Sequence, residues 1–347
     1  FLIGLSWLYI AYGQVTWVAG LFYGIKPAVT AIVLQAAHRI GSRALKNNLL
    51  WGIAGASFVA IFALNVPFPV IVLAAAFIGF LGGRMFPQSF NLGGGHVASN
   101  QHFGSAFIDD DTPTPSHALF TWQRLAHVLL AGAALWLIPM SLLVIYFGWD
   151  HTFTQMSWFF TKAALLTFGG AYAVLPYVFQ AAVEQFGWVM VTQMMDGLAL
   201  GETTPGPLIM VVAFVGFVGA YAQALLGPDS LFLAGALAAT LVTWFTFLPS
   251  FVFILAGGPF VESTHNDWKF TAPLTAITAA VVGVISNLAL FFGYHTMWPQ
   301  GFDAPFDTSA ALIAIAAAVA LLKFKLNVMQ VIGACGLLGI GLQYAIK

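Results

Sequence analysis

The chain has 347 residues, of which 60% are hydrophobic and 7% are charged, and its formal net charge is −1. An ordinary soluble domain has roughly 25% charged residues, so this composition excludes that class and predicts an integral membrane protein. The single cysteine, Cys335, excludes an intrachain disulfide and a metal cluster held by several cysteines.

Apolar runs near or above the roughly 20 residues that cross a bilayer as a helix recur along the whole chain. Because backbone polar groups must be satisfied inside the bilayer, these runs predict an all-α polytopic membrane protein. A shorter and less apolar run at 186–202 predicts a half-helix. We expect spanning helices at 1–12 (in part), 19–38, 49–65, 67–83, 125–147, 155–182, 205–226, 231–256, 270–292, 308–322 and 326–345.

The domain organisation follows from one long polar stretch. Residues 84–124 have the Gly, Pro and Asp content of a linker, and we expect them to be cytoplasmic. We interpret 1–83 as the C-terminal part of a first repeat half, 125–147 as a connecting transmembrane helix and 148–347 as the second repeat half. The chain is apolar from residue 1 and has no methionine there, so we expect an N-terminal portion of a longer protein to be missing.

Two short patterns occur in both parts of the chain in the same order. Pro27-Ala-Val-Thr-Ala-Ile corresponds to Pro273-Leu-Thr-Ala-Ile, and Leu64-Asn-Val corresponds to Leu326-Asn-Val. This order predicts an internal repeat in which 1–83 matches roughly 250–345.

The placement of basic residues predicts that the two repeats are inverted. Arg39, Arg43 and Lys46 follow the helix that contains Pro27, whereas Lys323 and Lys325 come one helix later in the second repeat. If basic loops are cytoplasmic, equivalent helices run in opposite directions. Inverted-topology halves with re-entrant or broken helices near the bilayer midplane are typical of secondary transporters.

The stretch LALGETTPGP at 198–207 places polar residues between two apolar runs. Thr204 is a good helix N-cap and Pro205 suits the first helical position, so we expect a helix to begin here. With the half-helix before it, this would form a hairpin whose tip directs free N–H groups at an anion inside the membrane. The alternative is an ordinary loop between two spanning helices.

A second break is predicted at Phe168-Gly169-Gly170, which Pro176 follows. Paired glycines weaken a helix and free its backbone groups, which is tolerated only against protein or a water-filled cavity. The alternative is a kink that serves helix packing. Lys162 lies in the same apolar run and is a functional candidate, unless it extends to the interface from near the helix end.

Two carboxylates flank the polar turn. Asp196 and Glu202 are candidates for binding a proton or orienting a cation, and the alternative is that they are solvated loop charges. The eight histidines show no metal-ligand spacing, and we expect no metal site and no cofactor. Walker A, GxSxG, HExxH and Rossmann patterns are absent from the sequence, so we expect neither nucleotide hydrolysis nor an enzyme.

Taken together, Phe168-Gly169-Gly170-Ala-Tyr172-Ala and residues 196–207 resemble the second-half signature of the chromate ion transporter family, in its long-chain form with two domains. Residues 20–41 are similar to the end of that family's first half, and the resemblance covers essentially the whole chain. Its members are bacterial plasma-membrane proteins that export chromate and have two homologous halves of opposite orientation. They have an FGG and a PGP motif in each half, whereas this chain has the second copy alone, and many have Gln where this chain has Glu202.

The resemblance implies a multi-pass secondary transporter in the bacterial plasma membrane. It would export chromate through a site between inverted repeats, driven by the membrane potential, by proton exchange or by both. A sulfate or other oxyanion transporter or channel would share this architecture, and a membrane-embedded chromate reductase is an enzyme alternative that no flavin, haem or metal pattern supports. Chromate, sulfate and the lipid bilayer are the expected partners, with no nucleic acid, and a homodimer is compatible with this interpretation.

The residues expected to bind substrate share the two broken stretches and the lysine beside them. Asp196 and Glu202 are the coupling candidates. The substrate-binding candidates are Lys162, Phe168, Gly169, Gly170, Tyr172, Thr203, Thr204, Pro205, Gly206 and Pro207.

Overall fold

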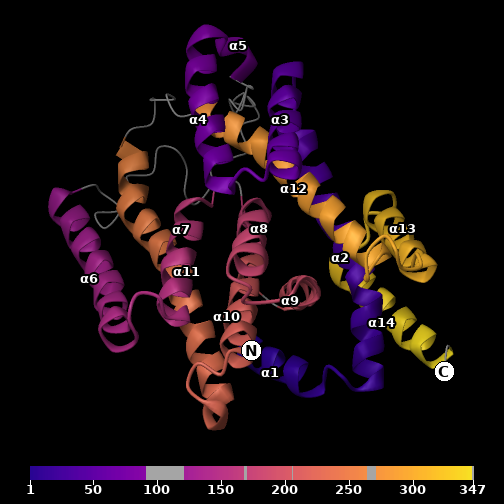
Figure 1. The fold of residues 1–347 in the computed structure, drawn as a ribbon. Helices are drawn as coiled ribbons and strands as arrows, with labels where there is room; N and C mark the ends of the chain where they lie inside the picture. Colours follow the sequence, from indigo (N-terminus) through magenta and orange to yellow (C-terminus); the bar gives the residue numbers. More distant parts are fainter. Residues whose placement is uncertain (91–120, 168–169, 205, 264–270, 346–347) are drawn as a thin grey trace, which may run out of the picture.

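The computed structural model describes residues 1–90, 121–167, 170–204, 206–263 and 271–345, and within these ranges the chain is helical without a β-strand (Figure 1). A π-helical turn (Gln180–Gln185) follows α8, and 3-10 turns (Leu208–Met210 and Pro228–Ser230) precede α10 and α11. The helices are α1 (Leu2–Tyr12), α2 (Thr16–Ala44), α3 (Asn48–Leu64), α4 (Phe68–Met85), α5 (Pro87–Phe90), α6 (Trp122–Phe147), α7 (Thr152–Leu165), α8 (Ala171–Phe179), α9 (Val191–Thr203), α10 (Val211–Ala222), α11 (Leu231–Ser263), α12 (Thr271–Met297), α13 (Thr308–Leu322) and α14 (Val328–Ala345).

Local sequence signals explain several helix starts. The side chain of Asn47 accepts a hydrogen bond from the Leu50 N–H at the start of α3, and Thr121 does the same for Arg124 at the start of α6. Asp307 caps α13 by accepting from the Ala310 N–H at 2.8 Å. Each cap satisfies one of the N–H groups that a helix leaves free at its first turn.

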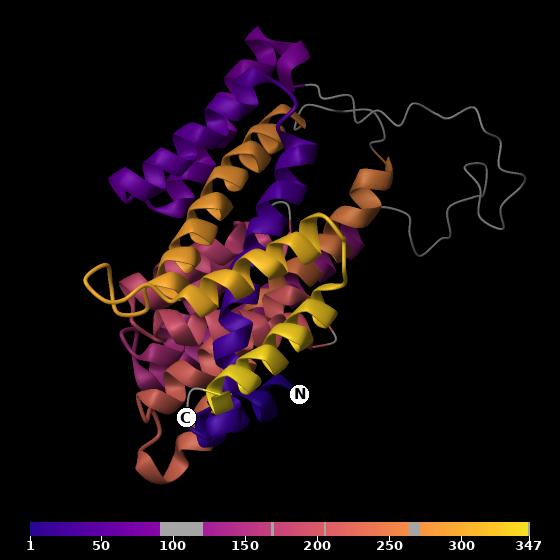
Figure 2. The same cartoon turned by 90° about the vertical axis from the view of Figure 1, so that its right-hand side faces the viewer.

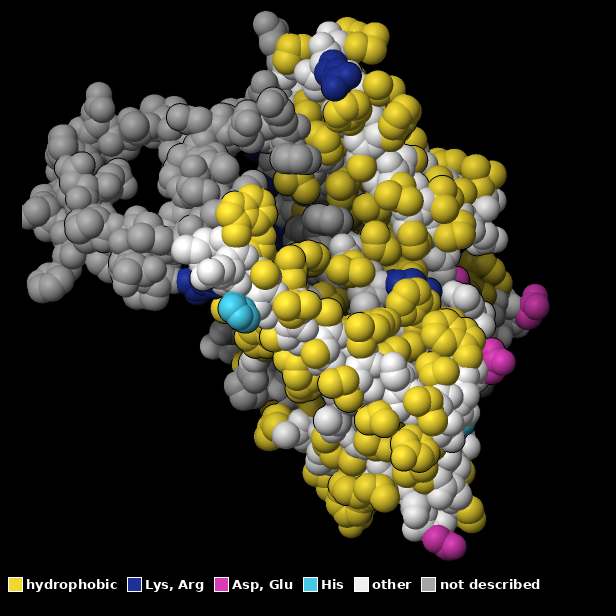
Figure 3. Space-filling model, turned by 90° about the vertical axis from the view of Figure 1, so that its left-hand side faces the viewer, with side chains coloured by type: hydrophobic (Ala, Val, Ile, Leu, Met, Phe, Trp, Pro, Cys, Tyr) yellow, Lys and Arg dark blue, Asp and Glu magenta, His cyan; other side chains and the backbone are white. Residues whose placement is uncertain are grey.

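The prediction of an all-α polytopic membrane protein is confirmed. Six described helices are long and apolar enough to cross a bilayer: α2, α4, α6, α11, α12 and α14. Large hydrophobic side chains such as Leu130 and Ile145 of α6 are exposed, and Trp122 and Tyr146 lie near the two ends of that helix, as in an aromatic belt. The face shown in Figure 3 is largely hydrophobic, with a few charged groups.

The helices at the start of the chain pack against the helices near its end. The long helices α2 and α12 contact each other; α12 also packs against α3 and α4, whereas α2 packs against α13 and α14. In Figure 2 the pair α13 and α14 lies across α2. If α2, α3 and α4 correspond to α12, α13 and α14, each long helix packs against the two helices that follow its counterpart. The repeat itself and its inversion both stay predictions.

Glycines permit the closest of these contacts. A Cβ atom built on Gly24 of α2 would overlap the carbonyl oxygen of Cys335 in α14, and one built on Gly283 of α12 would overlap that of Ala54 in α3. Only a residue without a side chain allows the two backbones to approach this closely.

Several predicted spans differ from the observed helices. The region 155–182 is not one helix, because α7 ends at Leu165 and α8 begins at Ala171. Helix α2 continues to Ala44, six residues beyond the predicted end at residue 38, and α6 covers the predicted span 125–147. Most of the predicted linker, including His96, His102, His117 and the three aspartates at 109–111, lies outside the described residues.

Candidate functional site

The chain breaks its helical path twice around α8 and α9, at the two motifs that the sequence singled out. The first break is confirmed by the end of α7 at Leu165 and by Gly170, whose φ of 105° and ψ of 175° place it in a backbone region open almost only to glycine. Gly170 is the N-cap of α8. The half-helix prediction is also confirmed, since α9 has 13 residues.

The predicted helix start at Thr204 is wrong. Thr204 is the C-cap of α9, and its hydroxyl donates to the Gly201 carbonyl oxygen at 2.9 Å. The residue before a proline favours extended backbone, and this condition applies to Thr204 and again to Gly206. The observed ψ of Thr204 is 142°, and α10 begins only at Val211, after the 3-10 turn.

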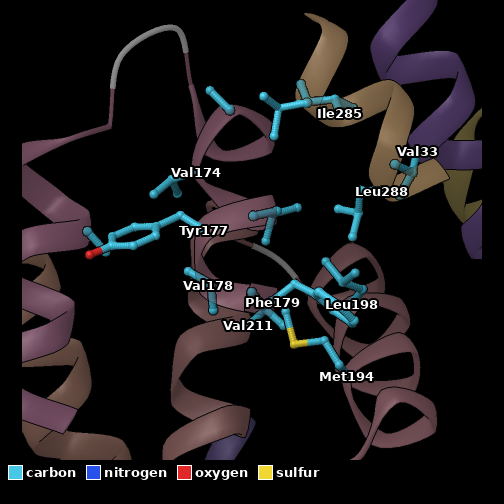
Figure 4. Close-up of a cluster of buried hydrophobic side chains, with 14 of the residues drawn as sticks. Val33, Val174, Tyr177, Val178, Phe179, Met194, Leu198, Val211, Ile285 and Leu288 are labelled. Atoms are coloured by element: carbon cyan, nitrogen blue, oxygen red, sulfur yellow. The ribbon is translucent and has the colours of Figure 1, made fainter. Parts of the chain in front are cut away.

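Buried hydrophobic side chains hold α8 and α9 in position. Figure 4 shows Val174 and Val178 on α8, Met194 and Leu198 on α9, and Val211 at the start of α10, all in one buried hydrophobic cluster. All five side chains are at most 2% exposed. The two broken segments are therefore anchored by packing, so the polar groups at their ends are fixed in place.

The N-terminus of α8 opens into a cavity of about 590 Å³. Arg39 and Arg43 of α2 line this cavity together with Gly170, Ala171 and Tyr172 at the helix start. The first turn of a helix offers free N–H groups and the positive end of its dipole. Two arginines and a helix N-terminus on one cavity form an arrangement suited to an anion.

Glu202 lies beside this cavity and is not a free loop charge. The Tyr172 hydroxyl donates a hydrogen bond to its Oε1 atom, and Arg39 interacts with it electrostatically. The Arg39 Cζ atom is 5.8 Å from the centroid of the Tyr172 ring. Arginine, tyrosine and glutamate therefore form one linked group at the end of α9.

Asp196 forms a second group of the same kind, in which a carboxylate lies beside a tyrosine and a cation. This group lies farther from the basic end of α2. The Tyr9 hydroxyl donates to its Oδ2 atom at 2.9 Å, and the Lys26 Nζ atom lies 3.7 Å from the same oxygen. Asp196 is 3% exposed, and its Oδ1 atom has no hydrogen-bond partner among the described residues. Phe22 and Phe214 pack against the Tyr9 ring edge-on and shield the group from one side.

Helix α9 thus presents two carboxylates, and each is hydrogen-bonded to a tyrosine and lies near a cation of α2. At 1.5 Å per residue, Lys26 and Arg39 are about 20 Å apart along α2. The two groups therefore lie at different depths along the same long helix.

The structure distributes the predicted site residues unevenly. Gly170 and Tyr172 line the cavity, whereas the hydroxyl of Thr203 bonds back to Leu200 within α9. Lys162 lies with its Nζ atom 5.8 Å from the Trp158 ring on its own helix and is not among the described residues that line the cavity. Gly206 and Pro207 are exposed at the turn. Phe168, Gly169 and Pro205 lie outside the described residues.

Four residues of these two groups and of the cavity lie outside the site predicted from the sequence: Tyr9, Lys26, Arg39 and Arg43. Lys26 met the criterion applied to Lys162, an ionisable residue inside an apolar run, and could have been selected. Arg39 and Arg43 were used only to assign orientation. Their role depends on a contact with α8, more than a hundred residues away, which no local pattern reports.

Replacing Gly170 with alanine should destabilise the protein by roughly 1–3 kcal/mol and weaken binding of a tetrahedral anion in the cavity. A Cβ atom there meets no neighbour within 4 Å among the described residues, so the effect comes from the backbone and from the displaced α8 N-terminus. Gly148→Ala is the matched control, because Gly148 has a φ of 87° and equally open surroundings between α6 and α7. Thermal unfolding and anion binding in detergent would measure both effects; equal anion binding by the two variants would contradict the assignment.

Comparison with known proteins identifies the family of the chain. A sequence model of the chromate transporter family, described as "Chromate transporter", matches residues 1–80 and 154–340. A chromate transport protein of Pseudomonas aeruginosa is 32% identical over 341 residues, which cover 96% of this chain and 70% of that protein. A chromate transport protein of Cupriavidus metallidurans is 23% identical over 97% of this chain and 70% of its own length.

A probable chromate transport protein of Synechococcus elongatus is 22% identical over 85% of this chain and 63% of that protein. No solved structure matches the chain with statistical significance. The family match includes α2, α8 and α9, the helices that carry both carboxylate groups and the cavity. The chain belongs to the chromate transporter family.

Proposed function

We propose that the protein is a secondary transporter that exports chromate across the bacterial plasma membrane and binds it first in the cavity at the start of α8. The observation that carries this proposal is the pair Arg39 and Arg43 facing the N-terminus of α8. Chromate is a tetrahedral dianion, and leaving water is prohibitive for such an ion unless fixed cations and N–H donors replace its hydration. The relatives named for chromate transport support the choice of substrate.

The position of the arginines supports the direction of transport. Arg39, Arg43 and Lys46 cluster at or just beyond the C-terminal end of α2, and a basic helix end favours the cytoplasmic side. A cavity on that side would collect the anion from the cytoplasm. The membrane potential is worth about 2.3 kcal/mol per charge per 100 mV, so it favours the outward movement of a dianion, with or without proton exchange.

Sulfate has the same charge and shape as chromate, and guanidinium and N–H groups recognise both through the same oxygens. A general oxyanion transporter is therefore the alternative within this proposal. Membership of the family favours a transporter over an enzyme.

Uptake of radiolabelled chromate into inside-out vesicles from bacteria that express the protein tests the proposal. We expect saturable uptake that increases with an imposed membrane potential of the physiological sign and is absent from vesicles without the protein. Uptake no greater than in empty vesicles would refute chromate transport. Equal inhibition by sulfate and by unlabelled chromate would reassign the protein as a general oxyanion transporter.

A further inference from the structure

The environment of Asp196 is incomplete for an ionised carboxylate. Its Oδ2 atom accepts one hydrogen bond from Tyr9, while the Lys26 Nζ atom at 3.7 Å is beyond ordinary hydrogen-bond distance. The buried Oδ1 atom has no partner among the described residues. A buried charge needs pairing and full hydrogen bonding, so a carboxylate held in this way is poised to change its partner or its charge.

Lys26 differs from Asp196 in accessibility. Its side chain is 29% exposed, against 4% for the side chain of Asp196. The ammonium group has three N–H donors, and its one ion pair within the described part of the chain, the long one to Oδ2, leaves them open to another acceptor. An anion could therefore contact the Lys26 ammonium group without displacing buried protein atoms other than Asp196.

We propose that Asp196 is a removable counter-ion for Lys26, and that the transported oxyanion takes its place on Lys26 once Asp196 has bound a proton. This inference rests on the proposed function. The proton comes from water on the side to which the site is open, and it adds to Oδ1, the oxygen without a partner. Tyr9 continues to donate to Oδ2, and the new O–H group on Oδ1 can donate to the arriving anion.

The charges explain why the proton is required. Lys26 and ionised Asp196 sum to zero, so a dianion beside them would bring an uncompensated charge of two into the protein interior. Protonation leaves the group at plus one and halves that excess, which favours binding of proton and anion together. Both would then move in the same direction, and the membrane potential, acting on one net negative charge, would drive export.

Apart from α1 and α2, the α-helices packed against α9 add no charged side chain to this sum. These are α10, α12 and α14, and within their described residues they contain no Asp, Glu, Lys or Arg. The hydrogen bonds and ion pairs of the described chain that reach Asp196 are those from Tyr9 of α1 and Lys26 of α2. The remaining titratable side chains on the packed helices are Tyr221, Tyr294, His295, Cys335 and Tyr344.

Proton uptake on anion binding tests the inference. Chromate is added to the purified protein in weakly buffered detergent at about pH 8, where the free ion is the dianion, and bound chromate and pH are both measured. We expect about one proton taken up per wild-type protein once chromate saturates it, and none by Asp196→Asn, which still binds chromate. Saturation of the wild type with chromate without proton uptake would overturn the inference, and so would proton uptake by Asp196→Asn.

Two further variants keep the test decisive if Asp196→Asn does not fold. Glu202→Gln removes a tyrosine-bonded carboxylate from the same helix and should keep the proton uptake, whatever its affinity. Lys26→Gln should lower chromate affinity by about tenfold or more and reduce proton uptake, because burial without a cation disfavours the charged form of Asp196 before chromate is added. Proton uptake by Lys26→Gln equal to that of the wild type would contradict the inference. Absence of chromate binding by the wild type would instead refute the proposed function.

Discussion

Replacing Arg39 or Arg43 with glutamine should weaken chromate binding about 10- to 100-fold for each arginine. A hydrogen bond to a charged group contributes about 1.5–3 kcal/mol, and each guanidinium can form such bonds to an oxyanion in the cavity at the start of α8. Lysine at either position should give an intermediate loss, because it keeps the charge but not the fork of donors. Chromate binding to purified protein and uptake by vesicles would measure the effect.

Arg84→Gln is the matched control for this experiment. Arg84 lies in the last turn of α4 with its Cζ atom 4.3 Å from the centroid of the Phe80 ring, and it is not among the residues that line the cavity. The Arg84→Gln substitution removes one positive charge from a basic helix end, as the α2 substitutions do, and should leave chromate affinity unchanged. If the arginine variants of α2 bind chromate as Arg84→Gln does, the cavity is not the binding site.

Gly24→Ala and Gly283→Ala should each prevent or severely weaken assembly of the helix bundle. At both positions the added Cβ atom would overlap a backbone carbonyl oxygen of another helix, which cannot move aside as a flexible side chain could. Overpacking of a rigid contact costs about 1–3 kcal/mol or more, and here the long helices would have to separate from α14 or α3. The yield of monodisperse protein and its thermal unfolding in detergent would report the loss.

Other glycines on α14 and α3 are the controls for this experiment. Gly341 of α14 and Gly55 of α3 have open space where a Cβ atom would lie, so alanine there should be tolerated or stabilise the helix by up to about 1 kcal/mol. Should Gly24→Ala be as stable as Gly341→Ala, the close packing between α2 and α14 would not be a determinant of the fold.

The spanning helices were predictable because run length and apolarity are local properties that the bilayer selects directly. The break at Gly170 was also predictable from a local property, since paired glycines weaken any helix that contains them. The start of the helix after α9 was not, because the N-cap preference of Thr204 competed with the extended backbone that a following proline favours, and the proline prevailed.

The candidate site was predictable only in part. The carboxylates Asp196 and Glu202 belong to one of the two sequence motifs and the cavity residue Tyr172 belongs to the other, so the motifs revealed them. Their cationic partners come from α2, far away in sequence, and nothing local distinguishes Lys26, which contacts Asp196, from Lys162, which lies over Trp158. The difference is set by tertiary packing of α2 against α9.

The packing of α2 against α12, α13 and α14, which are translated much later, has a consequence for biosynthesis. Ribosomes make α2 well before α9 and the α12–α14 group, so the helix with Lys26, Arg39 and Arg43 enters the membrane before its counter-ions and its packing partners exist. A cation such as Lys26 is costly in lipid while it is unpaired. We therefore expect α2 to become stable in the bilayer only after α9 and α12–α14 have been translated, and loss of one of these helices to make α2 more susceptible to quality-control proteases.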